Sequence, residues 1–212
     1  MKKLLLKSLL VFTAFTGLIA PQTTAQTSWE FKDAASGTDT WDASQYLSSP
    51  VQKSNSVVYT TTAGANPRLT TTSAGIDAGA ADGSDVLTPN ARRLMAITMR
   101  IGAGGPDYFR ILHPKSGGGD FYINYSTQLS IGDGKFHTYY VDLASGGAIQ
   151  AEWNGTKDTF TILFKTWNGT GNGANFNTAG ATIEIDRIEF VNNVFKGTAS
   201  NGTVGKTGNN GN

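Results

Sequence analysis

The chain has 212 residues, no cysteine, and a formal net charge of +1 from 17 basic and 16 acidic residues. The absence of cysteine excludes disulfides and thiolate metal sites, so stability must come from a packed core. The balanced charge lacks the basic excess that binding to a phosphate backbone requires, and we expect no nucleic-acid partner.

The first residues have the layout of a secretory signal peptide. Three lysines within the first seven residues precede an apolar run over residues 9–20, and small and polar residues follow up to Ala25. The run is too short to span a bilayer. We therefore expect residues 1–25 to be cleaved, leaving a protein that is extracellular, at the cell surface or periplasmic, with no membrane attachment. Cleavage would make Gln26 the first residue of the mature protein, and a signal sequence that ends in this way resembles those of exported proteins of the Bacteroidetes group.

Short alternating or apolar segments make up most of the remaining chain, with Gly, Asn, Asp, Ser and Pro clusters between them. The segments span residues 29–32, 56–62, 68–72, 94–101, 108–113, 121–126, 136–143, 160–167 and 183–191. None shows a sustained 3.6-residue period. The pattern predicts an all-β fold, a two-sheet antiparallel β-sandwich or jelly roll, over residues 26–195. Residues 196–212 lose the alternation and predict a flexible tail or linker rich in Gly, Asn and Thr.

The alternation assigns side chains to the two faces of each strand. The segment 108–113 allows either face to be the core, and we place Phe109 and Ile111 inside. The polar and aromatic side chains that then point outward are Arg100, Tyr108, Arg110, Tyr122, Asn124, Lys165 and Trp167.

The last segment changes phase. Its apolar residues occupy odd positions up to Ile185 and even positions from Ile188 onward, which predicts a β-bulge at Asp186. Across such a bulge, Glu184, Asp186 and Glu189 share the outer face.

The spacing E-x-D-x-x-E of these carboxylates resembles the active-site strand of laminarinase-type retaining glycoside hydrolases. In that family the first Glu is the nucleophile and the last is the acid/base. There, however, the motif lies near the middle of a larger domain, whereas here it ends the last predicted strand, and Arg187 stands where an apolar residue is usual. A retaining hydrolase that uses Glu184, Asp186 and Glu189 is therefore the enzymatic alternative.

The order of motifs along the chain resembles that of jelly-roll, galactose-binding-like carbohydrate-binding modules, which are attached to secreted bacterial polysaccharide-degrading enzymes. The motifs are TSWEFKD, NPRL, GDGKFHTYYVDL, DTFTILFKTW and the closing apolar-x-Ile-Asp-x-Ile-x-Phe. They cover nearly all of residues 28–191, although each is loose by itself. The resemblance implies a non-catalytic module that binds polysaccharide by aromatic stacking and polar contacts, alone or within a larger surface or enzyme assembly.

The predicted ligand-binding residues are the outward-facing set and one tryptophan of the loop after the first strand. They are Trp167, Tyr122, Asn124, Tyr108, Arg110, Arg100, Lys165 and Trp41. The ligand is a neutral β-glycan or, if the cations cluster, a uronate-containing polysaccharide. No catalytic residue is expected. A surface or matrix adhesion protein that uses the sandwich as a spacer is the remaining alternative.

The resemblance also implies one structural Ca²⁺ near the termini. Its ligands would be Glu30 or Asp33 together with Asp186, because Ca²⁺ prefers carboxylate and carbonyl oxygens. The alternative is that Asp186 pairs with Arg187 or meets solvent.

Overall fold

The computed structural model describes residues 28–31, 40–77, 94–115, 117–125, 127–143 and 153–191. The predicted signal peptide, the predicted tail and Asp33 lie outside these residues. The described part contains thirteen strands and no helix, and hence no helix able to cross a membrane. The strands are β1 Ser28–Glu30, β2 Asp42–Gln45, β3 Val51–Gln52, β4 Val57–Thr60, β5 Arg68–Thr71, β6 Ile76–Asp77, β7 Leu94–Ile101, β8 Tyr108–Pro114, β9 Asp120–Asn124, β10 His137–Asp142, β11 Thr156–Lys157, β12 Phe160–Lys165 and β13 Thr182–Val191.

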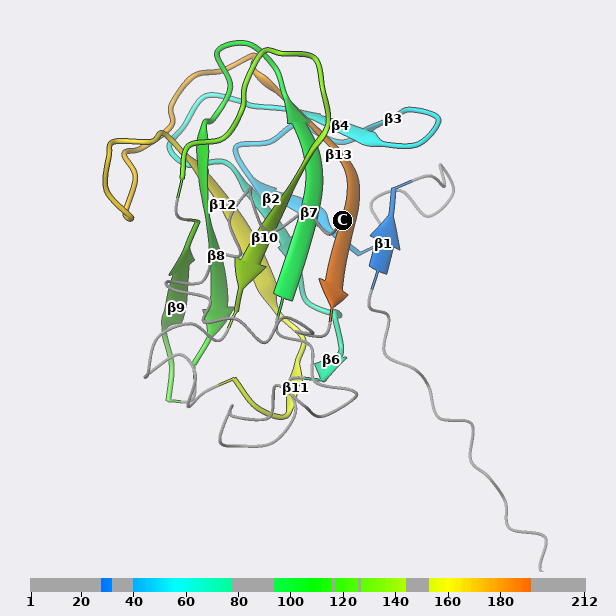
Figure 1. Cartoon of the computed structure of the whole chain (residues 1–212), viewed down its shortest axis with the longest axis vertical. Helices are drawn as coiled ribbons and strands as arrows, with labels where there is room; N and C mark the ends of the chain where they lie inside the picture. The colour runs from blue at the N-terminus through cyan, green and yellow to red at the C-terminus, as the bar shows by residue number, and fades with distance from the viewer. Residues whose placement is uncertain are drawn as a thin grey trace, which may run out of the picture.

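Two antiparallel sheets make up the molecule. Sheet A has the order β10-β7-β13-β4-β3, with β1 also paired to β13, and sheet B has the order β2-β5-β12-β8-β9. Strands β6 and β11 form a separate two-stranded pair. Figure 1 shows β10, β7 and β13 side by side at the front and β9, β8 and β12 to the left and behind. Most connections carry the chain from one sheet to the other, as in a jelly roll. The predicted all-β sandwich is confirmed.

The core lies between the sheets and is built from one face of each long strand. Phe109, Ile162 and Met99 are fully buried, as the alternation predicts. The ring centroids of Trp29 in β1 and Phe190 in β13 lie 5.5 Å apart, so the first and last strands both contribute to the core. Burial of such side chains supplies most of the stability of a protein without disulfides.

The predicted β-bulge in β13 is confirmed. Ile185 pairs with Met99 of β7, but the next residue of β7, Thr98, pairs with Arg187, so Asp186 is the extra residue. Across this irregularity Ile185 and Ile188 both remain fully buried. The bulge therefore keeps both halves of the strand facing the core.

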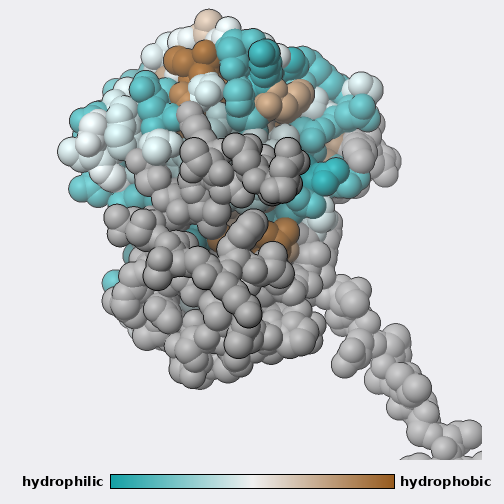
Figure 2. All heavy atoms as spheres, in the orientation of Figure 1, coloured by the Kyte–Doolittle hydropathy of each residue, from teal (hydrophilic) through white to brown (hydrophobic). Residues whose placement is uncertain are grey.

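On the face seen in Figure 2, the described residues are largely hydrophilic, with small hydrophobic patches. The large hydrophobic side chains that the structure exposes are Val51, Tyr122, Ile131 and Phe136.

Candidate functional site

The outward side chains of sheet B form the candidate site, which we call the B face. Strand register places them in rows across the sheet. Arg68 of β5, Leu163 of β12, Arg110 of β8 and Asn124 of β9 form one row. The neighbouring rows contain Thr70, Thr161, Leu112 and Tyr122 on one side, and Lys165 and Tyr108 on the other. Side chains directly opposite each other have Cβ atoms about 4.5–5.5 Å apart, so these groups meet.

Tyr122 supplies an exposed aromatic ring on this face. Its side chain is 45% exposed, and the guanidinium of Arg110 lies 4.3 Å from the centre of its ring. Nε of Arg110 donates a hydrogen bond of 2.6 Å to Oδ1 of Asn124. The cation–π contact and the hydrogen bond hold the ring and the guanidinium in one fixed arrangement.

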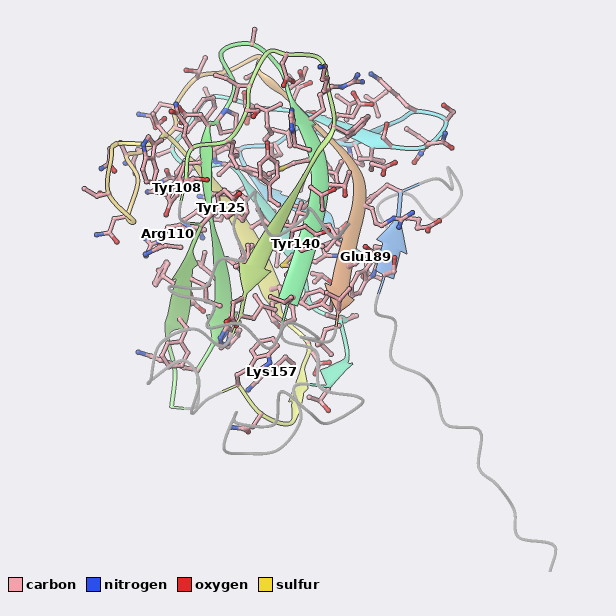
Figure 3. The ribbon with its side chains drawn as sticks, in the orientation of Figure 1. Tyr108, Arg110, Tyr125, Tyr140, Lys157 and Glu189 are labelled. Carbon is pink, nitrogen blue, oxygen red and sulfur yellow. The ribbon has the colours of Figure 1, made fainter. Side chains whose placement is uncertain are left out.

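Tyr108 lies on the same face but is covered. Its ring is fully buried, 5.2 Å from the ring of Trp167, and its hydroxyl donates to the carbonyl of Gly171 at 2.6 Å. Burial raises the pKa of Tyr108 to about 12, and the nearby Arg110 offsets this only in part. The expectation that Tyr108 contacts ligand is wrong in this conformation, because the segment after β12 folds over its ring. Figure 3 shows Tyr108 and Arg110 together beside β8.

Trp167 stands at the rim of the B face. It is partly buried and packs against the core, and its backbone N–H donates to Oδ1 of Asp107 at 2.6 Å. The other carboxylate oxygen of Asp107 accepts a 2.6 Å hydrogen bond from Gln128. Asp107 therefore fixes where the chain leaves β12, and with it the position of the Trp167 ring beside Tyr108.

Lys165 is the most buried cation of the B face. It is 7% exposed, and the described residues give its ammonium group neither a hydrogen bond nor an ion pair. Burial and the charge of Arg110 both lower the pKa of Lys165. The pKa of Arg110 is also lowered, mainly by burial. Nε of Arg68 is buried without a hydrogen-bond partner in the described structure. Three cations thus share this face.

Two predicted ligand contacts lie elsewhere. Arg100 belongs to β7 of sheet A, so it is on the opposite side of the sandwich from Tyr122. Trp41, expected to wall the site from a loop, is fully buried, with its ring centroid 6.0 Å from that of Trp29. Its indole packs into the core because the chain enters β2 directly after it. Both expectations are corrected.

The carboxylates of the hydrolase-like motif are engaged in ion pairs on sheet A. Oε2 of Glu184 accepts from Nε of Arg100 at 3.2 Å and from Nζ of Lys53 at 3.2 Å, and its Oε1 accepts from the Ser56 hydroxyl at 2.6 Å. Burial by itself raises the pKa of Glu184, but the hydrogen bonds from Ser56, Arg100 and Lys53 outweigh it and hold the pKa below its usual value.

Arg187 separates Glu184 from Glu189 on the same face. It lies 3.3 Å from Glu189 and 3.1 Å from Glu30. A glycosidase acid/base needs a raised pKa and an open cleft between two carboxyl groups. A guanidinium at this position opposes both requirements, so the motif lacks the geometry of a retaining hydrolase.

Two of the three predicted calcium ligands, Glu30 and Asp186, lie among the described residues. Glu30 is paired with Arg187, and a cation beside a carboxylate weakens binding of a second cation. The described part of the chain holds no group of three or more acidic or His side chains able to bind a metal. Asp33 lies outside the described residues, so the calcium site stays a prediction.

Arg68 is the B-face cation that sequence reasoning missed. It follows Pro67 at the start of β5, where it reads as part of the NPRL motif rather than as a site residue. The alternation Arg68-Leu69-Thr70-Thr71, with Leu69 buried, was the signal available.

No family model and no curated protein matches this chain. Solved structures of family 29 carbohydrate-binding modules are similar. One mutant module is 13% identical with a TM-score of 0.43, covering 79% of this chain and 93% of that chain. A mutant complexed with cellulohexaose is 13% identical with a TM-score of 0.44, covering 78% and 96%. A mutant complexed with mannohexaose is 14% identical with a TM-score of 0.41, covering 77% and 90%. At these values the ligands and binding residues of those modules do not carry over to this chain.

Proposed function

We propose that this protein is a secreted, non-catalytic module that binds polysaccharide on the B face, either alone or as part of a larger assembly. The observation that carries the proposal is the exposed ring of Tyr122, held by Arg110 and bordered by Asn124. One face of the ring lies against the guanidinium, so the exposed area lies on the rest of the ring. Aromatic rings stack on the apolar faces of pyranose rings, and neighbouring amides and guanidiniums bind hydroxyl groups.

The carboxylate arrangement supports binding rather than hydrolysis. Glu184 and Glu189 each lie against an arginine on sheet A, while the exposed aromatic and amide groups lie on sheet B. Groups that would cut a glycan and groups that would hold it are thus on opposite sides of the molecule.

Affinity electrophoresis through gels containing single polysaccharides tests the proposal. The panel includes glucomannan, xylan, mixed-linkage β-glucan, polygalacturonate and alginate. We expect at least one gel to retard the protein, no release of reducing sugar from any glycan, and a loss of affinity of about 10-fold or more in Tyr122→Ala.

Phe136→Ala is the matched control. Phe136 is 39% exposed, and Cζ of Arg100 lies 4.8 Å from the centroid of its ring. Unlike Tyr122, Phe136 lies on the outer side of sheet A. It should leave retardation unchanged. Equal losses in both variants would contradict binding on the B face, and no retardation by any glycan would instead favour an adhesion or spacer role.

Secretion rests on residues 1–25 alone. N-terminal sequencing of the exported protein should give Gln26 as the first residue. A mature chain that still begins at Met1 would contradict this part of the proposal.

A further inference from the structure

Three positive side chains on the B face have no carboxylate partner among the described residues. We call Arg68, Arg110 and Lys165 the cationic cluster. Leu163 lies directly opposite Arg68 on one side and Arg110 on the other, and Lys165 is two residues further along the same strand. Adjacent strands are about 4.8 Å apart, so the two arginine backbones are about 10 Å apart with Lys165 between them and one row away.

No carboxylate in the described part of the chain neutralises the cluster. Among the described residues, no carboxylate forms an ion pair with any of the three side chains. The carboxylates that the register places on this face, Asp42 and Asp120, lie on the edge strands β2 and β9. The central strands of the face therefore carry only positive charge.

Partial burial distinguishes the cluster from an ordinary solvated surface. Nε of Arg68 is buried and has no hydrogen-bond partner among the described residues, and Lys165, with 7% of its surface exposed, lies near a second cation, Arg110. A buried donor without a partner and like charges held close together both destabilise the folded protein. An anionic ligand group would supply the missing partner.

Arg110 is positioned to share that ligand group. Its Nε is bound to Asn124 and its plane lies on Tyr122, while its terminal N–H groups have no partner in the described structure. Such a fixed guanidinium binds carboxylate or sulfate through two parallel hydrogen bonds. The stacking ring of Tyr122 and the guanidinium of Arg110 are neighbours in adjacent rows, and Lys165 lies in the row beyond Arg110.

We infer that the polysaccharide bound on the B face is acidic, with a carboxylate or sulfate group of the sugar seated between Arg110, Lys165 and Arg68. This inference rests on the proposed function and specifies its ligand class. Neutral glycans would leave Lys165 unpaired.

Binding to matched polymers tests the inference. The probes are polygalacturonate and its highly methyl-esterified form, which differ in carboxylate charge, with alginate, carrageenan and glucomannan beside them. We expect at least one acidic polymer to bind about 10-fold or more tightly than glucomannan, and the affinity to fall as NaCl rises from about 0.05 to about 0.5 M. A preference for polygalacturonate or alginate would identify carboxylate, and a preference for carrageenan would identify sulfate.

Lys165→Met tests the role of the buried cation. It should lower affinity for the acidic polymer by about 10-fold without lowering the melting temperature, because it removes one of two neighbouring like charges. Lys135→Met, a change of equal charge at an exposed loop residue, is the control and should alter neither property. If Lys165→Met fails to fold, Arg68→Gln provides the second variant, because Arg68 is only partly buried.

The failures of the two proposals are distinguishable. Glucomannan bound as tightly as every acidic polymer, with no dependence on salt or Lys165 but with loss in Tyr122→Ala, would overturn the inference and leave the proposed function standing. No binding to any polymer would overturn both. A clear drop in melting temperature in Lys165→Met would show that the ammonium group has a structural partner.

Discussion

Each outer face of the sandwich carries an arginine beside an exposed aromatic ring, but the surroundings of the two arginines differ. On sheet A, Arg100 lies over Phe136, and on sheet B, Arg110 lies over Tyr122. Arg100 is also bound to the carboxylate of Glu184, whereas the one described side chain that accepts a hydrogen bond from Arg110 is the neutral amide of Asn124. An arginine beside an exposed ring therefore does not by itself identify a binding site. The difference lies in whether the protein neutralises the charge. Figure 3 shows Arg110 on one side of the molecule and Glu189 of sheet A on the other.

The largest effect should come from breaking the pairing on sheet A. Glu184→Gln removes the acceptor shared by Arg100, Lys53 and Ser56, and leaves a partly buried guanidinium unpaired. We expect a loss of about 2–3 kcal/mol in the free energy of unfolding, measured by denaturant titration, with glycan affinity unchanged. Glu189→Gln, which loses one exposed pair, is the control. An activity that releases reducing sugar and disappears in Glu184→Gln would support the hydrolase alternative.

The same carboxylate predicts how stability depends on pH. The pKa of Glu184 is lower in the folded protein than in the unfolded chain, so the unfolded state binds more protons as the medium becomes acidic. Its contribution is fully present above the unfolded pKa of about 4.3 and is lost as pH falls through the folded pKa. Unfolding free energies measured from about pH 6 to about pH 3 should decline less steeply in Glu184→Gln than in the unchanged protein. Parallel curves would show that Glu184 is not the group responsible.

A smaller effect should come from the segment that covers Tyr108 on sheet B. Gly173 has a φ of 60°, and a Cβ there would lie 2.5 Å from the Tyr108 ring. Gly173→Ala should cost about 2 kcal/mol of stability and lower glycan affinity by shifting the rim beside Trp167. Gly169 also has a left-handed backbone, with a φ of 80°, but a Cβ there would meet open space. Gly169→Ala should therefore cost about 1 kcal/mol of stability and leave glycan affinity unchanged. Equal losses in the two variants would mean that backbone strain alone accounts for both.

The smallest effect should come from the exposed ion pairs of sheet A. Arg187→Gln removes pairs to Glu30 and Glu189, in which every partner is about a third exposed or more. We expect a change of at most about 0.5–1 kcal/mol in the free energy of unfolding, because solvent screens such pairs. A loss as large as that in Glu184→Gln would show that the pairing around the bulge acts as one network.

The alternation of apolar and polar residues predicted the long strands and their inner faces, because it can be read within each strand without knowing which strands pair. Phe109 and Ile111 are inside and Arg110 is outside, as expected. The short strands β2, β3, β6 and β11 were missed, because three of them have two residues and β2, with the sequence DASQ, has one apolar side chain and hence no alternation.

Sheet membership could not be predicted in the same way, because it depends on which distant strands pair. Arg100 and Arg110 both read as outward-facing cations, yet pairing places them on opposite sheets. Coverage of Tyr108 depends on a segment more than sixty residues away at Gly171. The burial of Trp41 likewise follows from packing against Trp29 rather than from its own neighbours in sequence.

The extra residue in β13 has a consequence for how this sequence tolerates changes in length. Because Ile185 and Arg187 pair with consecutive residues of β7, removal of Asp186 would leave a strand of regular alternation, with Ile185, Ile188 and Phe190 still facing the core. Position 186 should therefore accept an in-frame codon deletion, whereas the same deletion in the middle of the regular strand β12 would turn half of its inner side chains toward water.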